Sequence, residues 1–102
     1  MNTLIGLIRE AIHGRKLLEF RYDLHPRVVE PMCLGEVETG RWELRAQQVG
    51  GSSSTSRSFP DGVPRLFKLA KMIDASVLPA SFDIPGFYAR GDKAFIRIDA
   101  QL

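Results

Sequence analysis

The sequence predicts a small, mainly β domain, with one helix in front of a small barrel or strongly bent sheet of about five strands. Three observations support this fold class. Residues 4–12 carry apolar side chains at helical spacing, and from Leu18 onward apolar residues alternate with polar ones. Turn-forming residues separate the alternating segments. The chain has 102 residues, so we expect a single domain over residues 1–102.

The predicted helix spans about residues 3–14. Thr3 is the expected N-cap, with Asn2 as the alternative, and Gly14 is well placed to end the helix in a left-handed turn. The apolar stripe consists of Leu4, Leu7, Ile8, Ala11 and Ile12. One amphipathic helix cannot bury its stripe alone, so we expect it to pack on the sheet that follows.

The predicted strands follow the helix in a barrel of about residues 16–80. Their approximate bounds are 18–22, 27–34, 42–47, 65–70 and 73–78. Pro31 lies inside the second strand, which indicates an edge or a bulge, because proline has no N–H for the ladder. Residues 35–40 are expected to form a polar turn.

Two further segments are less regular. Residues of about 49–64 are rich in glycine, serine and proline, which predicts a long mobile loop. A C-terminal extension over about residues 81–102 follows the barrel. Its last part alternates as in a strand, although Asp92 could also cap a helix there. We favour the strand for this tail.

Composition excludes several classes of protein. The net charge of +2 does not argue for a dedicated nucleic-acid binder, which usually has a strong basic excess. Cys33 is the single cysteine, so we interpret it as a buried thiol in a reducing compartment. The first residues do not have the pattern of a signal peptide, and no apolar run approaches the roughly 20 residues of a membrane span. We therefore expect a cytoplasmic protein.

Catalytic motifs are not recognisable in the chain. A nucleophile elbow, a Cys-x-x-Cys pair and a phosphate-binding loop are all missing from the sequence. His13, His25 and Cys33 do not have the spacing of a zinc site, so we expect no metal. We therefore predict a non-enzymatic protein without a cofactor.

Basic and aromatic residues beside the predicted strands are the candidate ligand-binding residues. Tyr22 and Arg65 each end an apolar row, which predicts that both lie at the rim of the core, where a polar tip reaches water or a ligand. Arg27 and Lys68 lie on or beside the strands, and Arg45 points away from the apolar row of its own strand. An aromatic hydroxyl with an arginine suits an anion, or a base with its phosphate.

The Gly-Gly-Ser-Ser-Ser segment adds Ser53 to these candidates. Backbone N–H groups and hydroxyls in such a loop could cradle a phosphate or a carboxylate. A flexible connector without a ligand is the alternative interpretation, because low-complexity loops are common.

Four segments together resemble the WYL domain family. In order they are residues 18–22 (LEFRY), 27–31 (RVVEP), 42–46 (WELRA) and 65–69 (RLFKL). The resemblance spans roughly residues 4–82, and the leading helix fits the family's usual approach to the first strand. The Gly/Ser loop and Pro85-Gly86-Phe87 are similar to features of short stand-alone members.

The resemblance implies an Sm-like or SH3-like barrel. It also implies a sensor of nucleotides or nucleic-acid fragments, because WYL domains occur in bacterial transcription regulators and phage-defence proteins. Tyr22, Arg27 and Arg65 match the family's tyrosine and arginine positions. Position 43 departs from the pattern, since Glu43 stands where the name motif has tyrosine. One helix cannot form a helix-turn-helix, so we do not expect the chain to read operator DNA by itself.

Two functions are therefore expected. The first is a ligand-binding sensory or regulatory module for nucleotides or single-stranded nucleic acid, in a bacterial regulatory or defence context. The alternative is a protein-interaction or self-association module, such as a homodimer, without a small ligand. Small barrels host many unrelated functions, so the fold does not choose between them.

Overall fold

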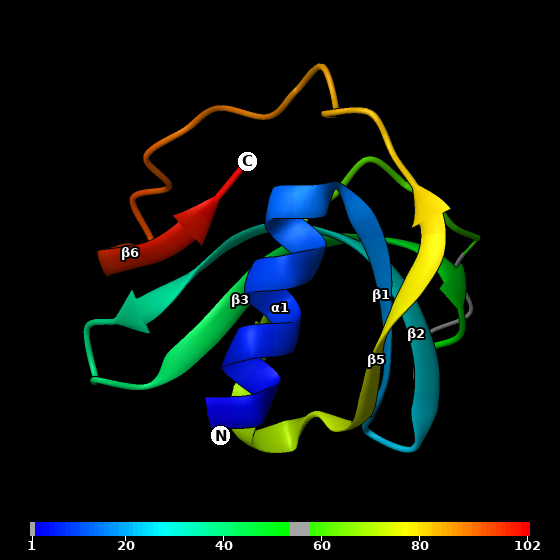
Figure 1. Ribbon diagram of the computed structural model, residues 1–102, viewed down its shortest axis with the longest axis horizontal. Coiled ribbons are helices and arrows are strands. Elements are labelled where there is room, and N and C mark those ends of the chain that lie inside the picture. Colours follow the sequence, from blue (N-terminus) through cyan, green and yellow to red (C-terminus); the bar gives the residue numbers. More distant parts are fainter. Residues whose placement is uncertain (1, 54–57) are drawn as a thin grey trace.

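The computed structural model describes residues 2–53 and 58–102. Over these residues the chain forms one α-helix, one short 3-10 helix and six strands of a single antiparallel sheet (Figure 1). The elements are α1 (Asn2–Gly14), β1 (Lys16–Tyr22), β2 (His25–Val37), β3 (Trp42–Gly51), β4 (Arg65–Lys68), η1 (Leu69–Lys71), β5 (Ile73–Ser81) and β6 (Phe95–Gln101). The predicted mainly β class with an N-terminal helix is confirmed.

The long strand β2 organises the sheet. The strand order is β4-β3-β2-β1-β5, and β6 pairs with β2 as well. Strand β1 pairs with the first part of β2 up to Val29, and β6 pairs with the last part from Cys33. The change of neighbour falls at Pro31, where the pairing with β3 also shifts register. A proline cannot donate to a ladder, so the bulge predicted at this residue is where β2 exchanges one partner for another.

Strands β2 and β3 are longer than predicted, and a glycine lies near the end of each one. The turn expected over 35–40 is shorter, because β2 continues through Val37. A β-carbon at Gly35 would overlap the Arg97 carbonyl, so this glycine allows β6 to approach rather than making a turn. Strand β3 likewise continues to Gly51, whose φ is +82° and whose β-carbon would overlap the Pro26 carbonyl. The predicted loop of about 49–64 therefore begins later, and its residues 54–57 lie outside the described part.

Other expectations for the strands hold with small changes. The fourth strand, predicted over 65–70, ends at Lys68, and its last two positions belong to η1 (Leu69–Lys71) instead. The C-terminal tail is a strand, as favoured, and makes β6 the sixth strand where about five were expected. No helix in the described part of the chain is long and apolar enough to span a membrane.

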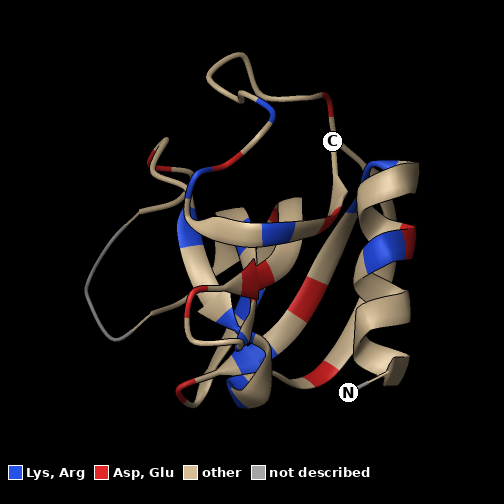
Figure 2. Ribbon diagram, turned by 90° about the vertical axis from the view of Figure 1, so that its left-hand side faces the viewer, with Lys and Arg blue, Asp and Glu red and all other residues tan. Residues whose placement is uncertain are grey.

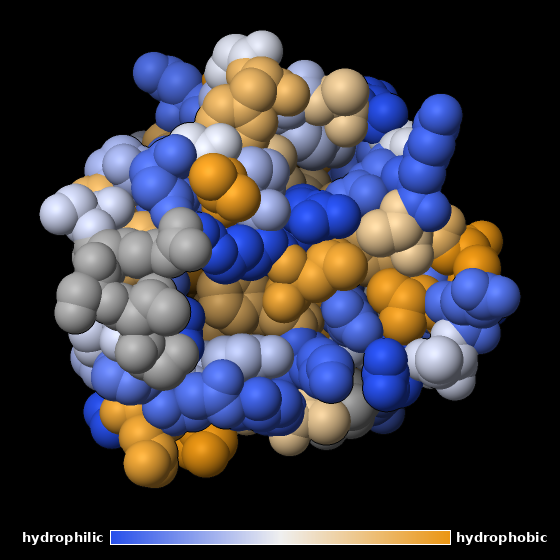
Figure 3. Space-filling view, turned by 180° about the vertical axis from the view of Figure 1, so that it is seen from behind, coloured by the Kyte–Doolittle hydropathy of each residue, from blue (hydrophilic) through white to orange (hydrophobic). Residues whose placement is uncertain are grey.

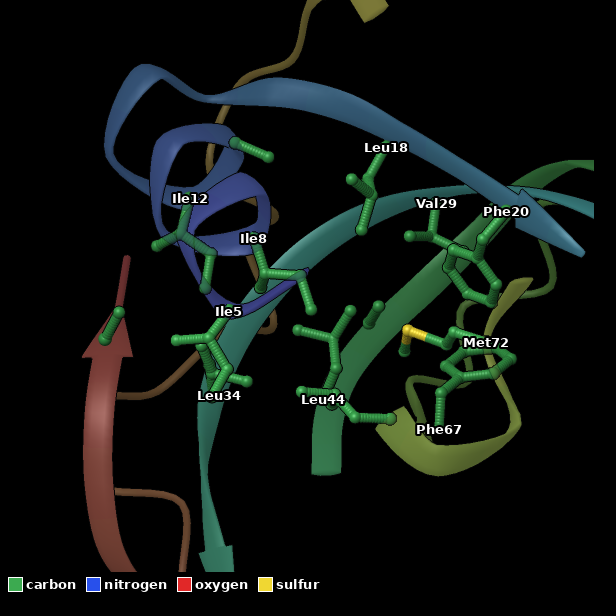
Figure 4. Close-up of a cluster of buried hydrophobic side chains, with 14 residues drawn as sticks. Ile5, Ile8, Ile12, Leu18, Phe20, Val29, Leu34, Leu44, Phe67 and Met72 are labelled. Atoms are coloured by element: carbon green, nitrogen blue, oxygen red, sulfur yellow. The ribbon is translucent and has the colours of Figure 1, made fainter. Parts of the chain in front are cut away.

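The main core lies between α1 and the sheet. Ile5, Ile8 and Ile12 of the helix point into the concave side of the sheet, where Leu18 and Leu44 meet them (Figure 4). The helix therefore packs on the sheet as expected from its stripe. A second, smaller apolar cluster contains residues that alternate with core residues and face the other way; its buried members are Cys33, Val37 and Phe95. Viewed from the side away from α1, apolar residues lie in the middle of the surface with hydrophilic ones around them (Figure 3).

The sheet curls so that β1 and β4, which are not neighbours in the strand order, meet each other. The ring of Phe67 in β4 lies 5.3 Å from that of Phe20 and 5.1 Å from that of Tyr22, both in β1. The Lys68 backbone N–H also donates a hydrogen bond to the Tyr22 hydroxyl at 3.0 Å. These contacts bring the rim of β1 beside the end of β4, which positions the candidate site.

Candidate functional site

Three aromatic rings form the base of the candidate site. Phe20, Tyr22 and Phe67 pack edge to face, with centroid distances between 5.1 and 6.1 Å, which is the preferred geometry for aromatic pairs. Phe20 and Phe67 are buried, whereas Tyr22 is half-buried at the rim. The hydrogen bond from Lys68 fixes the Tyr22 ring, so one edge of an otherwise apolar group is polar and reaches the surface.

Arg27 lies against these rings with its charge largely withdrawn from water. Its guanidinium carbon is 5.5 Å from the Tyr22 ring centroid and 5.9 Å from that of Phe67. Arg27 is 7% exposed. Its Nη1 donates to Gln48 Oε1 at 3.2 Å and its Nη2 to the Tyr22 carbonyl at 3.3 Å, while Nε has no hydrogen-bond partner. Burial lowers the pKa of the Arg27 guanidinium, and nearby Asp23 opposes that shift.

The buried charge of Arg27 is therefore not matched by a bonded carboxylate. Both hydrogen-bond acceptors are neutral amide oxygens, and no ion pair is formed by Arg27 within the described residues. A buried cation without a counterion is costly, because its lost hydration is repaid only in part by neutral oxygens. An anion bound beside Tyr22 would supply the missing charge.

Lys71 is a site residue that sequence reasoning missed. Its Nζ lies 4.8 Å from the Tyr22 ring centroid and 2.7 Å from Asp23 Oδ1. This hydrogen bond raises the pKa of Lys71 and lowers the pKa of Asp23. The side chains of Lys71 and Asp23 are 46% and 47% exposed, so the pair is accessible to solvent. We call Tyr22, Arg27, Phe67, Lys68 and Lys71 the Tyr22 cluster.

Arg65 lies next to this cluster, but its charge is already neutralised. It forms two hydrogen bonds with the Asp61 carboxylate, at 2.7 and 3.2 Å, and donates a third to the Val63 carbonyl. Its guanidinium also lies 5.9 Å from the Phe59 ring centroid. Arg65 nevertheless contributes to lowering the pKa of Arg27, which places the two cations in one electrostatic environment.

Arg45 belongs to a different part of the molecule. It pairs with Asp92 at 2.8 Å, on the opposite face of β3 from the core residue Leu44. Desolvation raises the pKa of Asp92, but the hydrogen bonds from Arg45 and Ala94 outweigh it and hold that pKa below its ordinary value. Arg45 thus ties the segment before β6 to the sheet and does not join the Tyr22 cluster.

Ser53 is half-buried, and it directly follows β3 and Ser52. The preceding residue, Ser52, donates its backbone N–H to the Pro26 carbonyl, and its own carbonyl accepts a hydrogen bond from Gln48. Gln48 also accepts the hydrogen bond from Arg27. The start of the Gly/Ser loop is therefore anchored to the residue that orients Arg27.

Glu43, the departure from the family motif, points away from the aromatic rings of the Tyr22 cluster, although it is the cross-strand partner of Lys68. It alternates with Leu44 along β3, so it lies on the other face of the sheet. Glu43 is 6% exposed, and Arg41 Nη2 lies 3.8 Å from its carboxylate. Its negative charge is therefore partly compensated by Arg41.

The charge distribution suits a small ligand better than an extended one. Both Lys and Arg positions and Asp and Glu positions are spread over the ribbon in the view of Figure 2. Most described arginines form ion pairs, and no group of three or more metal-ligating side chains lies among the described residues. A duplex-binding surface usually needs a broader basic area.

Comparisons with known proteins agree with this fold. The chain matches no protein-family model and no curated protein. Among solved structures it is similar to Proteasome accessory factor B/C (PafBC) of Arthrobacter aurescens, with a TM-score of 0.65 and 26% sequence identity. The similarity covers 85% of this chain and 13% of the PafBC chain, so this chain spans only a small part of that protein's length. The similarity supports a WYL-like fold.

Proposed function

We propose that this protein is a non-enzymatic regulatory module that binds a nucleotide or single-stranded nucleic acid at the Tyr22 cluster. The observation that carries the proposal is Arg27, a buried guanidinium that lies on two aromatic rings and donates only to neutral oxygens. PafBC is a regulator that contains a WYL domain, which supports a regulatory role for a chain of this fold. The expected setting is the bacterial cytoplasm, in a regulatory or defence system.

The chemistry of the cluster fits a phosphate next to a planar group. Charge-assisted hydrogen bonds from arginine and lysine to phosphate oxygens are about twice as strong as neutral ones. The exposed Lys71 and Lys68 can reach a phosphate from the solvent side, and the buried Arg27 adds its positive charge from behind the Tyr22 ring. The Tyr22 ring offers an aromatic face, and base–aromatic stacking tolerates any sequence.

Ser53 and Arg65 would act at the border of this site. A ligand that reaches Arg65 must compete with Asp61, which already takes both of its terminal nitrogens. The Gly/Ser loop begins at the strand pair that contains Arg27, so Ser53 would contact the same ligand from the loop side. Arg45, bound to Asp92, is not part of this proposal.

Binding of a fluorescently labelled thymidine oligonucleotide tests the proposal. Fluorescence anisotropy at low salt should show binding that weakens as salt is added, because phosphate contacts release counterions. The Lys71→Gln variant should bind severalfold more weakly, since it loses a phosphate contact but keeps the aromatic rings. Lys93→Gln, which removes an exposed lysine outside the cluster, should bind like the wild type.

Two results would contradict the proposal. One is the absence of binding for oligonucleotides, accompanied by no change in melting temperature with mononucleotides. The other is an equal loss of affinity in the Lys71 and Lys93 variants, because it would show that only overall charge matters.

A protein-interaction or self-association module is the second candidate. An open groove of about 480 Å³ lies between α1 and the segment from η1 to β5; apolar Leu4, Leu7 and Met72 line it together with polar Thr3 and Asp74. Apolar grooves beside a helix are common sites for a partner. Light scattering tests this candidate: a monomer at all concentrations would remove self-association.

A further inference from the structure

A small cavity beside the Tyr22 cluster has no role in the function proposed above. Its volume is about 180 Å³, and it is lined by Gly40, Arg41, Trp42, Lys68 and Ala70. It lies where the turn between β2 and β3 meets the end of β4. Pockets that enclose a whole small ligand measure roughly 300–1,000 Å³. This cavity is therefore large enough for one flat group of a ligand but too small for a complete one.

Lys68 connects the cavity to the Tyr22 cluster. Lys68 lines the cavity, and its backbone N–H holds the Tyr22 hydroxyl at 3.0 Å. Ala70 and Lys71 are adjacent in sequence, and they border the cavity and the Tyr22 ring respectively. A ligand bound at the cluster therefore has this cavity within reach of its next chemical group.

The lining of the cavity favours a planar aromatic group that is joined to a negatively charged group. Trp42 is half-buried, so part of its surface is left for a ligand, and tryptophan is the strongest of the aromatic platforms for cations and planar groups. Arg41 and Lys68 are exposed at its border. The Arg41 side chain is 57% exposed and lies only within 3.8 Å of Glu43, so it can turn toward a ligand.

We propose that this cavity is the base subsite of the ligand whose phosphate binds at the Tyr22 cluster. The proposal rests on the proposed function, and it adds a contact that none of the predicted site residues supplies. The base would lie against Trp42, with Arg41 and Lys68 beside its sugar-phosphate. A ligand of this class is a single-stranded oligonucleotide or a nucleotide with an accessible base.

Trp42 is the single tryptophan of the chain, so its fluorescence reports on this cavity directly. An unlabelled thymidine oligonucleotide should quench Trp42 fluorescence in step with the binding measured by anisotropy. An abasic oligonucleotide of the same length, which keeps the phosphates, should bind more weakly and leave Trp42 fluorescence unchanged.

A substitution that fills the cavity provides the mutational arm. Ala70 is exposed and lines the cavity, so Ala70→Leu should block it without disturbing the core. This variant should bind the thymidine oligonucleotide about tenfold more weakly, which is within the range for losing one base–aromatic stack. The affinity of Ala70→Leu for the thymidine oligonucleotide should then equal the affinity of the wild type for the abasic oligonucleotide. Ala80→Leu, at an exposed alanine of β5 outside the cavity, is the matched control and should behave like the wild type.

The outcomes separate the subsite from the site. Oligonucleotide binding by anisotropy with unchanged Trp42 fluorescence and full affinity in Ala70→Leu would overturn the base subsite and leave the Tyr22 cluster intact. No binding of any oligonucleotide would overturn both.

Discussion

Replacing Arg27 by methionine should separate ligand binding from folding. Methionine keeps an unbranched apolar stem against Tyr22 and Phe67, where sulfur–aromatic contacts are favourable, and removes the guanidinium. If Arg27 serves to bind a ligand, its buried charge should destabilise the free protein. If it is present for the fold, its removal should cost as much as breaking a buried network.

The magnitude follows from the contacts of Arg27. The variant loses two hydrogen bonds of 3.2 and 3.3 Å, each worth about 1.5–3 kcal/mol because the donor is charged, and leaves the oxygens of Gln48 and Tyr22 without that donor. Against this loss, it removes a desolvated cation without a bonded counterion, which costs several kcal/mol in a protein interior. The two effects are similar in size, so the free energy of unfolding should change by no more than about 1 kcal/mol.

Urea unfolding and oligonucleotide anisotropy, measured on the same preparations, test this reasoning. Loss of charge-assisted hydrogen bonds to a phosphate should weaken binding tenfold or more, since about 1.4 kcal/mol corresponds to a factor of ten. The oligonucleotide affinity of Arg27→Lys should lie between those of the wild type and Arg27→Met, because lysine keeps the charge but not the planar fork. Destabilisation above about 3 kcal/mol with unchanged affinity would refute the reasoning and make Arg27 a structural residue.

Three further predictions concern the scaffold that holds the site. Gly35→Ala should lower stability by about 1–3 kcal/mol, since the added carbon would overlap a backbone carbonyl of β6. Gly6→Ala, on the open side of α1, should raise stability by up to about 1 kcal/mol. Paired thermal melts would contradict this prediction if the two melting temperatures shifted in the same direction. Burial raises the pKa of the Cys33 thiol to about 11, so a thiol reagent at neutral pH should label the folded protein far more slowly than the unfolded one, and equal rates would show that the thiol is accessible. Because the pKa of Asp92 is lowered in the folded state, its contribution to stability is present above the ordinary value of 3.8 and lost as the pH falls through the folded value; in acid titrations, Asp92→Asn should be less stable than the wild type near neutral pH and approach it in strong acid, and a constant difference would exclude the pair with Arg45 as the cause.

Strands β1 and β3 could be predicted from the sequence because apolar and polar residues alternate along them. The pairing partners of the strands could not be predicted, since pairing is decided by contacts between distant segments of the chain. The tail alternates as a strand, but nothing local indicates that β6 pairs with the second part of β2. Gly35 illustrates the same limit: a glycine before a polar segment is typical of a turn, yet here it allows two backbones to approach.

The position of Tyr22 in the candidate site could be predicted from the sequence, but most ion-pair partners of the nearby cations could not. Alternation along β1 placed Tyr22 on the core side at the rim, where it lies. Arg65 and Asp61 are four residues apart, so their ion pair had a signal in the sequence. The partner of Arg45 is Asp92, 47 residues further along the chain, and no local pattern could indicate it. Lys71 was missed because it follows the strand and reaches Tyr22 only after η1 turns the chain.

The cations held in ion pairs must be set apart before the local positive charge at the candidate site can be judged. A net charge of +2 argues against a broad electrostatic footprint, but a site for one phosphate needs only a local excess. Arg45 and Arg65 are each held by a carboxylate, whereas the cations around the Tyr22 ring face a single acid, Asp23, which is bound to Lys71. Acidic Glu43 lies on the other face of β3 from the aromatic rings, but it is paired across the strands with Lys68 and offsets part of this excess. Two of the described cations that form no ion pair, Arg27 and Lys68, thus lie beside the aromatic rings of the Tyr22 cluster, which suits recognition of a nucleotide by stacking and phosphate contact.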